Sequence, residues 1–153
     1  MGLKRTHGAA VPRPIYVAEP DARYGVRLPL VVDCSLLAAV VFGETERPAA
    51  EQRIAGHALH APRLLDHEMA QVALTKLKRG HAAADLLESL ADYRAQDIEL
   101  HDGDPLAQFE LGRRYGLSAY DAAYLWLAAA LRAPLATFDQ RLAEAAQAHL
   151  GQL

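Results

Sequence analysis

Four acidic side chains stand where carboxylates could bind a metal ion together. Asp33 and Asp139 each follow a short apolar run of the kind that forms a buried strand. Asp121 is the single charged side chain of the otherwise apolar stretch 119–131, which predicts a buried helix. Glu68 borders the apolar stripe of another predicted helix. Because a buried carboxylate without a cation is costly, we expect the four to meet around a bound cation.

The residues beside these acids favour a hard divalent cation. Ser35 lies two positions after Asp33, and Thr137 lies two positions before Asp139, so a hydroxyl accompanies each carboxylate. Mg²⁺ and Mn²⁺ prefer oxygen donors of this kind. Such an ion neutralises phosphates, lowers the pKa of a bound water and stabilises charge in an in-line displacement. Carboxylates about 5 Å apart repel by roughly 3 kcal/mol per pair at an effective dielectric of about 20, and a cation would offset that repulsion.

Each acid also has an ordinary structural explanation. Asp33 and Asp139 could cap the helix that follows each strand. Asp121 could close a capping box with Ser118, and Glu68 could be a helix-edge residue whose charge reaches solvent. These alternatives stay open for each acid taken alone, whereas the four together favour a metal site.

Length and composition indicate one soluble domain. With 153 residues, 52% hydrophobic and 23% charged, the chain can bury a core of its own. Cys34 is the only cysteine, which excludes an internal disulfide and a zinc site of paired thiolates and fits a reducing cytosol. No run of about 18 apolar residues could cross a bilayer, and no secretory signal is readable. We therefore expect a cytoplasmic protein without a membrane span.

The first 27 residues differ in composition from the rest. They contain three glycines and three prolines and show no helical period, so we expect residues 1–27 to form an extended appendage with one short strand at 15–17. Residues 28–153 then form the folded domain. The appendage has five basic and two acidic side chains, which leaves eleven basic and seventeen acidic ones in the domain. A domain this acidic binds nucleic acid poorly by itself, so a polyanionic substrate would need the bound cation.

Apolar periodicity predicts strands that alternate with helices. The expected strands are 28–32, 58–61, 98–101 and 134–138. The expected helices are 36–42, capped by Ser35, and then 47–57, 63–79, 81–94, 105–115, 118–132 and 139–149. This alternation is typical of α/β layers around a mostly parallel sheet, which binds ligands at the carboxyl ends of its strands.

Four motifs contain the acids in a fixed order. They are Val31-Val32-Asp33-Cys34-Ser35, Pro62 to Glu68, Leu117 to Tyr124, and Leu135 to Leu142. Over residues 30–149 this ordered set resembles the PIN domain family, in particular the toxin ribonucleases of VapBC toxin–antitoxin pairs. The resemblance implies a three-layer α/β/α fold, metal-dependent hydrolysis of RNA, and a site for Mg²⁺ or Mn²⁺ made by Asp33, Glu68, Asp121 and Asp139.

The resemblance also implies partners and supporting residues. Ser35 and Thr137 stand where the family keeps supporting hydroxyls, and Gln71 stands where members often carry asparagine. A small antitoxin whose arginine enters the site is expected, as is a homodimer, for which the apolar face 36–42 is one candidate. Gln71 also breaks the His-Glu-x-x-His zinc motif that His67 would begin.

A basic cluster and several histidines carry weaker signals. Lys76, Lys78 and Arg79 end one predicted helix, where they could contact the RNA backbone or interact with the helix dipole. The remaining histidines, His60 and His101 among them, show no ligand spacing, and we expect surface or core roles for them.

The sequence supports two hypotheses of different classes. In the first, the protein is an endoribonuclease in which Asp33, Asp121 and Asp139 hold one or two divalent ions. Glu68 then binds a metal or orients the attacking water, and the resemblance implies products with 5′-phosphate and 3′-hydroxyl ends. In the second hypothesis, a catalytically silent PIN-like module binds a protein or an RNA through the same acidic pocket. The intact set of four acids favours the first.

Overall fold

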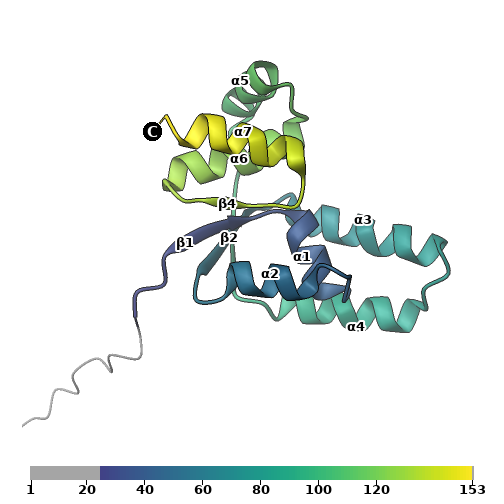
Figure 1. Ribbon diagram of the computed structural model, residues 1–153. Coiled ribbons are helices and arrows are strands. Elements are labelled where there is room, and N and C mark those ends of the chain that lie inside the picture. The colour runs from purple at the N-terminus through teal and green to yellow at the C-terminus, as the bar shows by residue number, and fades with distance from the viewer. Residues whose placement is uncertain (1–24, 153) are drawn as a thin grey trace, which may run out of the picture.

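Short apolar runs form a parallel sheet in the computed structural model, which describes residues 25–152 (Figure 1). The strands are β1 (Pro29–Val32), β2 (Ala58–Pro62), β3 (Ile98–His101) and β4 (Leu135–Ala136). They lie in the order β3-β2-β1-β4, and each neighbouring pair is parallel. The predicted parallel sheet is therefore confirmed, while the strand expected at 15–17 lies outside the described residues.

β4 is shorter than the strand predicted at 134–138. The Asp33 amide donates to the Ala136 carbonyl at 3.2 Å, and β1 ends at this point because the chain turns into a helix. Thr137 and Phe138 therefore extend past the end of their partner strand. The Thr137 hydroxyl instead donates to the Asp33 carboxylate, so the shortening of β4 contributes directly to the candidate site.

Helices connect and cover the strands. Within residues 25–152 they are α1 (Cys34–Val41), α2 (Arg47–Ile54), α3 (Leu65–Lys78), α4 (Ala83–Arg94), α5 (Pro105–Tyr115), α6 (Ala119–Leu131) and α7 (Gln140–Leu150). Of the helices in this described part, none is both long and apolar enough to span a bilayer.

The first helix begins earlier than predicted. α1 starts at Cys34, and its N-cap is Asp33, whose Oδ1 accepts the Leu36 amide at 3.0 Å. The prediction that Ser35 caps this helix is therefore wrong, because Asp33 occupies the capping position and Ser35 lies inside the first turn. Its hydroxyl donates to Asp33 Oδ1 at 2.8 Å instead. Two other acceptors predicted at helix starts do cap their helices, Ser118 at α6 and Asp139 at α7.

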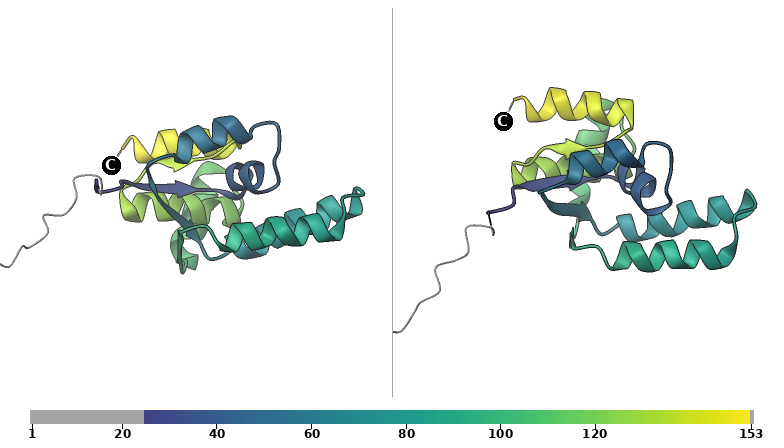
Figure 2. Two further views of the ribbon diagram at one scale, coloured as in Figure 1. Left: turned by 90° about the horizontal axis from the view of Figure 1, so that it is seen from below. Right: turned by 60° about the horizontal axis from the view of Figure 1, so that its bottom comes forward.

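Helices enclose the sheet from both faces. α6 packs against β1, β2 and β4, and Figure 2 shows it across the sheet from α7 and α2. α5 packs on α6, while α3 pairs with α4 as a hairpin that projects beyond the carboxyl ends of the strands. This arrangement is the predicted three-layer α/β/α fold.

The buried core explains why α6 is apolar on nearly every side. Its buried residues are Ala122, Ala123, Tyr124, Leu125, Leu127 and Ala128. On α1, Leu36 and Leu37 are almost fully buried in the same core. The expectation that the face 36–42 serves a homodimer is therefore wrong for these side chains, because they fill the interior of their own chain.

Candidate active site

Asp33 lies at the carboxyl end of β1 with only 5% of its surface exposed. Its carboxylate accepts hydrogen bonds from the Leu36 amide and from the hydroxyls of Ser35 and Thr137. Burial raises the pKa of this carboxyl above its ordinary value, and these hydrogen bonds oppose the rise. The negative charge of Asp139 raises the pKa further. Asp33 is therefore a buried carboxyl whose charge is solvated by donors but is not neutralised.

The hydroxyls of Ser35 and Thr137 connect the starts of two helices. Thr137 Oγ1 accepts the Asp139 amide at 2.9 Å, and Ser35 Oγ accepts the Phe138 amide at 3.0 Å. Asp139 Oδ1 in turn accepts the Leu142 amide at 2.8 Å as the cap of α7. The caps of α1 and α7 are thus fixed relative to one another, although Asp33 and Asp139 are 106 positions apart in the chain.

Glu68 lies in the first turn of α3 and is half-buried. Its Oε2 accepts a short hydrogen bond of 2.5 Å from the Tyr124 hydroxyl of α6. Burial raises the pKa of Glu68, the Tyr124 hydrogen bond lowers it, and the charges of Asp33 and Asp121 raise it again. The pKa of Tyr124 is raised as well, through burial first and the adjacent Glu68 charge second, so its proton stays on the phenol.

Asp121 lies in the first turn of α6 and is half-buried. Its amide donates to Ser118 Oγ at 3.0 Å, and the Ser118 hydroxyl donates to Asp121 Oδ2 at 2.9 Å. The carboxylate therefore interacts with the capping side chain itself. This bond uses one of the two carboxylate oxygens, and within residues 25–152 no hydrogen bond engages Oδ1.

Charge couples these four carboxylates, which we call the acid centre (Asp33, Glu68, Asp121 and Asp139). Asp139 acts on Asp33, and both Asp33 and Asp121 act on Glu68. The structure thus brings acids from four separate elements into one neighbourhood. Within residues 25–152, no lysine or arginine forms an ion pair with any of them.

The donor set of the acid centre fits a hydrated Mg²⁺ or Mn²⁺. Among the described residues, no three of these carboxylates offer oxygens that all lie within 4.8 Å of one another. Mg²⁺ is usually held by one or two carboxylates and keeps several waters, so it does not require a closed protein cage. Of the four acids, Asp33 is buried, Glu68 and Asp121 are half-buried and Asp139 is exposed, and a set of carboxylates that has no ion pair with a lysine or arginine among the described residues matches that ion in chemistry and in charge.

The other predicted site residues differ in where they lie. Gln71 is exposed, and within the described chain its side-chain amide has no hydrogen bond to the acid centre. Lys76 Nζ pairs with Glu44 at 2.7 Å and lies 5.4 Å from the Phe42 ring centroid, so its charge is already engaged. Lys78 and Arg79 are exposed at the far end of α3, about 15 Å of helical rise beyond Glu68. The structure does not place this basic cluster beside the acids.

Tyr124 and Cys34 also make contacts beside the acid centre. Tyr124 orients Glu68, and the signal for it was its position three residues after Asp121, on the same side of the helix. Cys34 packs its sulfur 3.8 Å from that of Met69. Burial, followed by the charges of Glu68, Asp33 and Glu44, raises the pKa of Cys34 to about 12, so the thiol stays protonated.

The three-layer α/β/α fold places the acid centre at the carboxyl ends of its parallel strands, where sheets of this kind bind their ligands. Residues 30–148 match the PIN domain family, and the chain belongs to this family. Ribonuclease VapC9 of Mycobacterium tuberculosis is 35% identical over 120 residues, covering 78% of this chain and 92% of the relative. Ribonuclease VapC3 of Pyrobaculum aerophilum is 31% identical over 122 residues, covering 75% of this chain and 92% of that protein.

Two solved structures share the fold. PAE2754 from Pyrobaculum aerophilum superposes with a TM-score of 0.63 at 20% identity, over 82% of this chain and 88% of that one. VapC20 of Mycobacterium tuberculosis, described as a toxin that cleaves the sarcin-ricin loop, superposes with a TM-score of 0.56 at 15% identity. That match covers 76% of this chain and 94% of VapC20. At these identities the structures support the fold.

Proposed function

We propose that this protein is an endoribonuclease that hydrolyses RNA phosphodiester bonds with Mg²⁺ or Mn²⁺, and that it is the toxin of a VapBC-type toxin–antitoxin pair. Residues 28–153 are the nuclease domain in this proposal. The observation that carries it is Asp33, a buried carboxyl that shares its neighbourhood with three further acids and no basic partner among the described residues. Membership of the PIN domain family and the names of the VapC relatives support the same activity.

The acid centre supplies the ligands in this proposal. Asp33, Asp121 and Asp139 would hold one or two ions, and Glu68 would bind an ion or orient the attacking water. The bound cation would lower the pKa of that water and stabilise the charge of the phosphorane-like transition state. The products expected from the family resemblance carry 5′-phosphate and 3′-hydroxyl ends.

The chain's own hydrogen bonds support these roles. Ser35 and Thr137 both donate to Asp33, which fixes the direction in which its remaining lone pairs point. Tyr124 does the same for Glu68. Because the pKa of Glu68 is raised, its carboxylate is a better proton acceptor than an ordinary glutamate, which suits it to take a proton from water.

The partners follow from charge and from exposed apolar side chains. Among the described residues, no lysine or arginine forms an ion pair with the acid centre, which favours a small antitoxin that inserts an arginine, because the guanidinium would neutralise the carboxylates as a metal does. We also infer a homodimer, which Leu106, Phe109 and Tyr120 support as large exposed apolar side chains on neighbouring helices. The cytoplasm is the compartment that suits an RNA substrate and a single free cysteine.

Cleavage of single-stranded RNA tests the proposed activity. The purified protein should cut RNA in Mg²⁺ or Mn²⁺, lose the activity in EDTA and lose it in Asp121→Asn, which removes charge at constant volume. Asp97→Asn is the matched control, because Asp97 is exposed in the loop before β3. Cleavage that survives both EDTA and Asp121→Asn would exclude this mechanism. An intact fold that binds RNA without cutting it would instead favour the silent module.

A further inference from the structure

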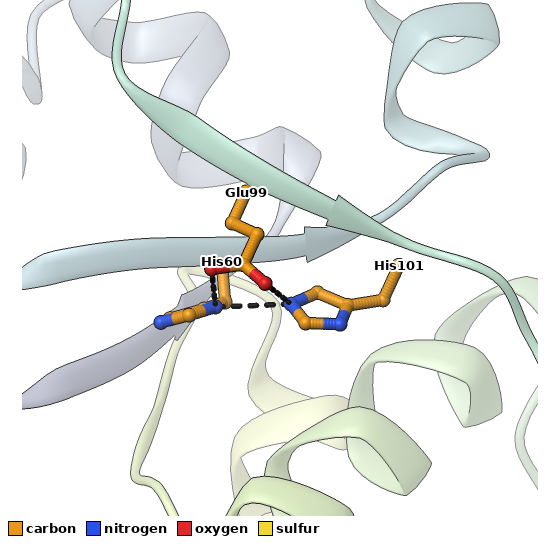
Figure 3. Close-up of polar contacts among 3 residues, drawn as sticks. All are labelled: His60, Glu99 and His101. Atoms are coloured by element: carbon orange, nitrogen blue, oxygen red, sulfur yellow. Dashed lines mark hydrogen bonds and ion pairs between the residues drawn. The ribbon is translucent and has the colours of Figure 1, made fainter.

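A second group of metal-binding side chains lies on the sheet outside the acid centre. His60 belongs to β2, while Glu99 and His101 belong to β3 (Figure 3). His60 is paired in register with Glu99, and His101 follows Glu99 by two residues, so all three side chains emerge on the same face of the sheet. His60 Nδ1 lies 3.0 Å from His101 Nε2, and the two nitrogens lie 3.6 and 3.7 Å from the Glu99 carboxylate oxygens.

We propose that His60, Glu99 and His101 form a binding site for a transition-metal ion such as Zn²⁺, with water as the fourth ligand. Two imidazoles and one carboxylate are a set that Zn²⁺ takes in open sites. Zinc–ligand bonds of about 2.0–2.1 Å in a tetrahedron separate the ligand atoms by about 3.3 Å. The three separations of 3.0, 3.6 and 3.7 Å, of which the last two are to Glu99 Oε2 and Oε1 respectively, lie on both sides of that value, so small side-chain movements suffice to admit the ion.

The surroundings of the cluster suit a site that forms before the ion arrives. The side chains of His60 and His101 are 14% and 22% exposed, so strands and neighbouring residues hold both rings in place. Glu99 is 67% exposed and can turn toward an ion without breaking a buried contact. His101 also borders a hollow of about 350 Å³ between the ends of the strands and the starts of α5 and α6, which gives an ion access to the ring.

The chemistry of this cluster differs from that of the acid centre. The 3.0 Å contact between the two rings is a hydrogen bond that needs no metal, and Glu99, which faces both nitrogens, adds the carboxylate that completes a set of three ligands. With a metal, both nitrogens present lone pairs to the ion and the carboxylate balances its charge. Imidazole favours Zn²⁺ over Mg²⁺, whereas the all-oxygen acid centre favours Mg²⁺ or Mn²⁺. The two sites can therefore be occupied and tested separately.

Such an ion would connect the outermost described strand to its neighbour. β3 lies at one end of the order β3-β2-β1-β4, and its backbone hydrogen bonds to β2 are supplemented here by contacts between side chains. A ligand that binds the native state alone raises its stability in proportion to the logarithm of its concentration over Kd. Zn²⁺ should therefore raise the thermal midpoint of the protein.

Isothermal titration of the full-length protein with Zn²⁺, in saturating Mg²⁺, tests this site. We expect one Zn²⁺ per chain that persists in Asp33→Asn, because Asp33 is not one of the three proposed ligands and the substitution keeps the volume of the side chain. His60→Gln and His101→Gln should each weaken the binding by more than about 100-fold, since even the loss of an outer partner of a metal ligand costs about 10–100-fold. His81→Gln is the matched control, because His81 is exposed outside the cluster.

Two further measurements keep the test decisive if a histidine variant is unstable. Glu99→Gln changes an exposed side chain and should also weaken Zn²⁺ binding and abolish the Zn²⁺-dependent rise in thermal midpoint. Co²⁺ in place of Zn²⁺ should give the intense visible absorption of a four-coordinate ion in the native protein and in Asp33→Asn. The proposal is overturned by an absence of Zn²⁺ binding to the native chain, by binding that both histidine variants retain, or by binding that Asp33→Asn removes.

Discussion

At the scale of single residues, Asp33 depends on one hydroxyl two positions away in the sequence and on another 104 positions away. Ser35 and Thr137 each donate to its carboxylate while accepting a backbone amide of the chain that follows β4. Each hydroxyl therefore stabilises the charge of Asp33 and also the path of the backbone. The sequence indicated that hydroxyls accompany the acids, but it paired Thr137 with Asp139, whereas the carboxylate that Thr137 contacts is that of Asp33.

Thr137→Val removes both of these contributions without changing the size of the side chain. It removes the donor to Asp33 and the acceptor for the Asp139 amide. We expect a loss of about 1.5–3 kcal/mol in the free energy of unfolding, measured by urea titration, because a buried hydrogen bond to a charged group is lost. RNA cleavage should fall by about 10–100-fold, as for other residues that orient a metal ligand.

Thr75→Val is the control for this substitution. Thr75 donates to the Gln71 carbonyl within α3 and makes no contact with the acid centre in the described chain. It should leave RNA cleavage unchanged. Equal loss of cleavage in the two variants would show that Thr137 has no special role at Asp33.

At the scale of helices and strands, the sequence was informative where hydrophobic periodicity is strong. The apolar stretch 119–131 became α6 within one residue of its predicted bounds, and the run before Asp33 became β1. Predictions failed at the ends of helices and strands, where a neighbouring strand decides at which residue the element stops. The end of β4 is set by where β1 turns into α1, and the pairing of His60 with His101 is set by the register of β2 on β3. Neither can be read from local spacing.

Tyr124→Phe tests the contact between α3 and α6. The substitution keeps the buried ring but removes the hydrogen bond to Glu68, which normally lowers the pKa of that carboxyl. The pKa of Glu68 should therefore rise further. If Glu68 accepts the proton of the attacking water, the acid limb of the pH–rate profile must move to higher pH, because the carboxylate forms only at higher pH.

Tyr93→Phe is the matched control. Tyr93 lies on α4 and donates to Asp66, which lies on α3 like Glu68 but does not belong to the acid centre. The control substitution should leave the acid limb where it is in the native protein. An unmoved acid limb in Tyr124→Phe, with reduced cleavage, would mean that Glu68 acts as a metal ligand only.

At the scale of the whole molecule, the buried Asp33 and the half-buried Glu68 oppose folding when no cation is bound. Burial raises the pKa of Asp33 above 3.8 and that of Glu68 above 4.5, so the native state holds more protons on these groups than the unfolded chain does. Stability falls with pH wherever the native state binds more protons. The contribution of Asp33 and Glu68 to the free energy of unfolding therefore decreases as pH rises from the ordinary pKa of each group to its raised native pKa, and it stays low at higher pH.

A divalent cation should reverse that loss. In EDTA, the free energy of unfolding measured with urea should decline less between about pH 4 and about pH 7 in Asp33→Asn/Glu68→Gln than in the native protein, because the double variant lacks both titrating carboxyls. Mn²⁺ at about 100 times its Kd should add about 2.7 kcal/mol near neutral pH. The gain should shrink toward low pH, where protons compete for the carboxylates, and it should be nearly absent in the double variant. A gain of equal size in both proteins would place the bound Mn²⁺ outside the acid centre, and the nuclease proposal would then lose its metal site.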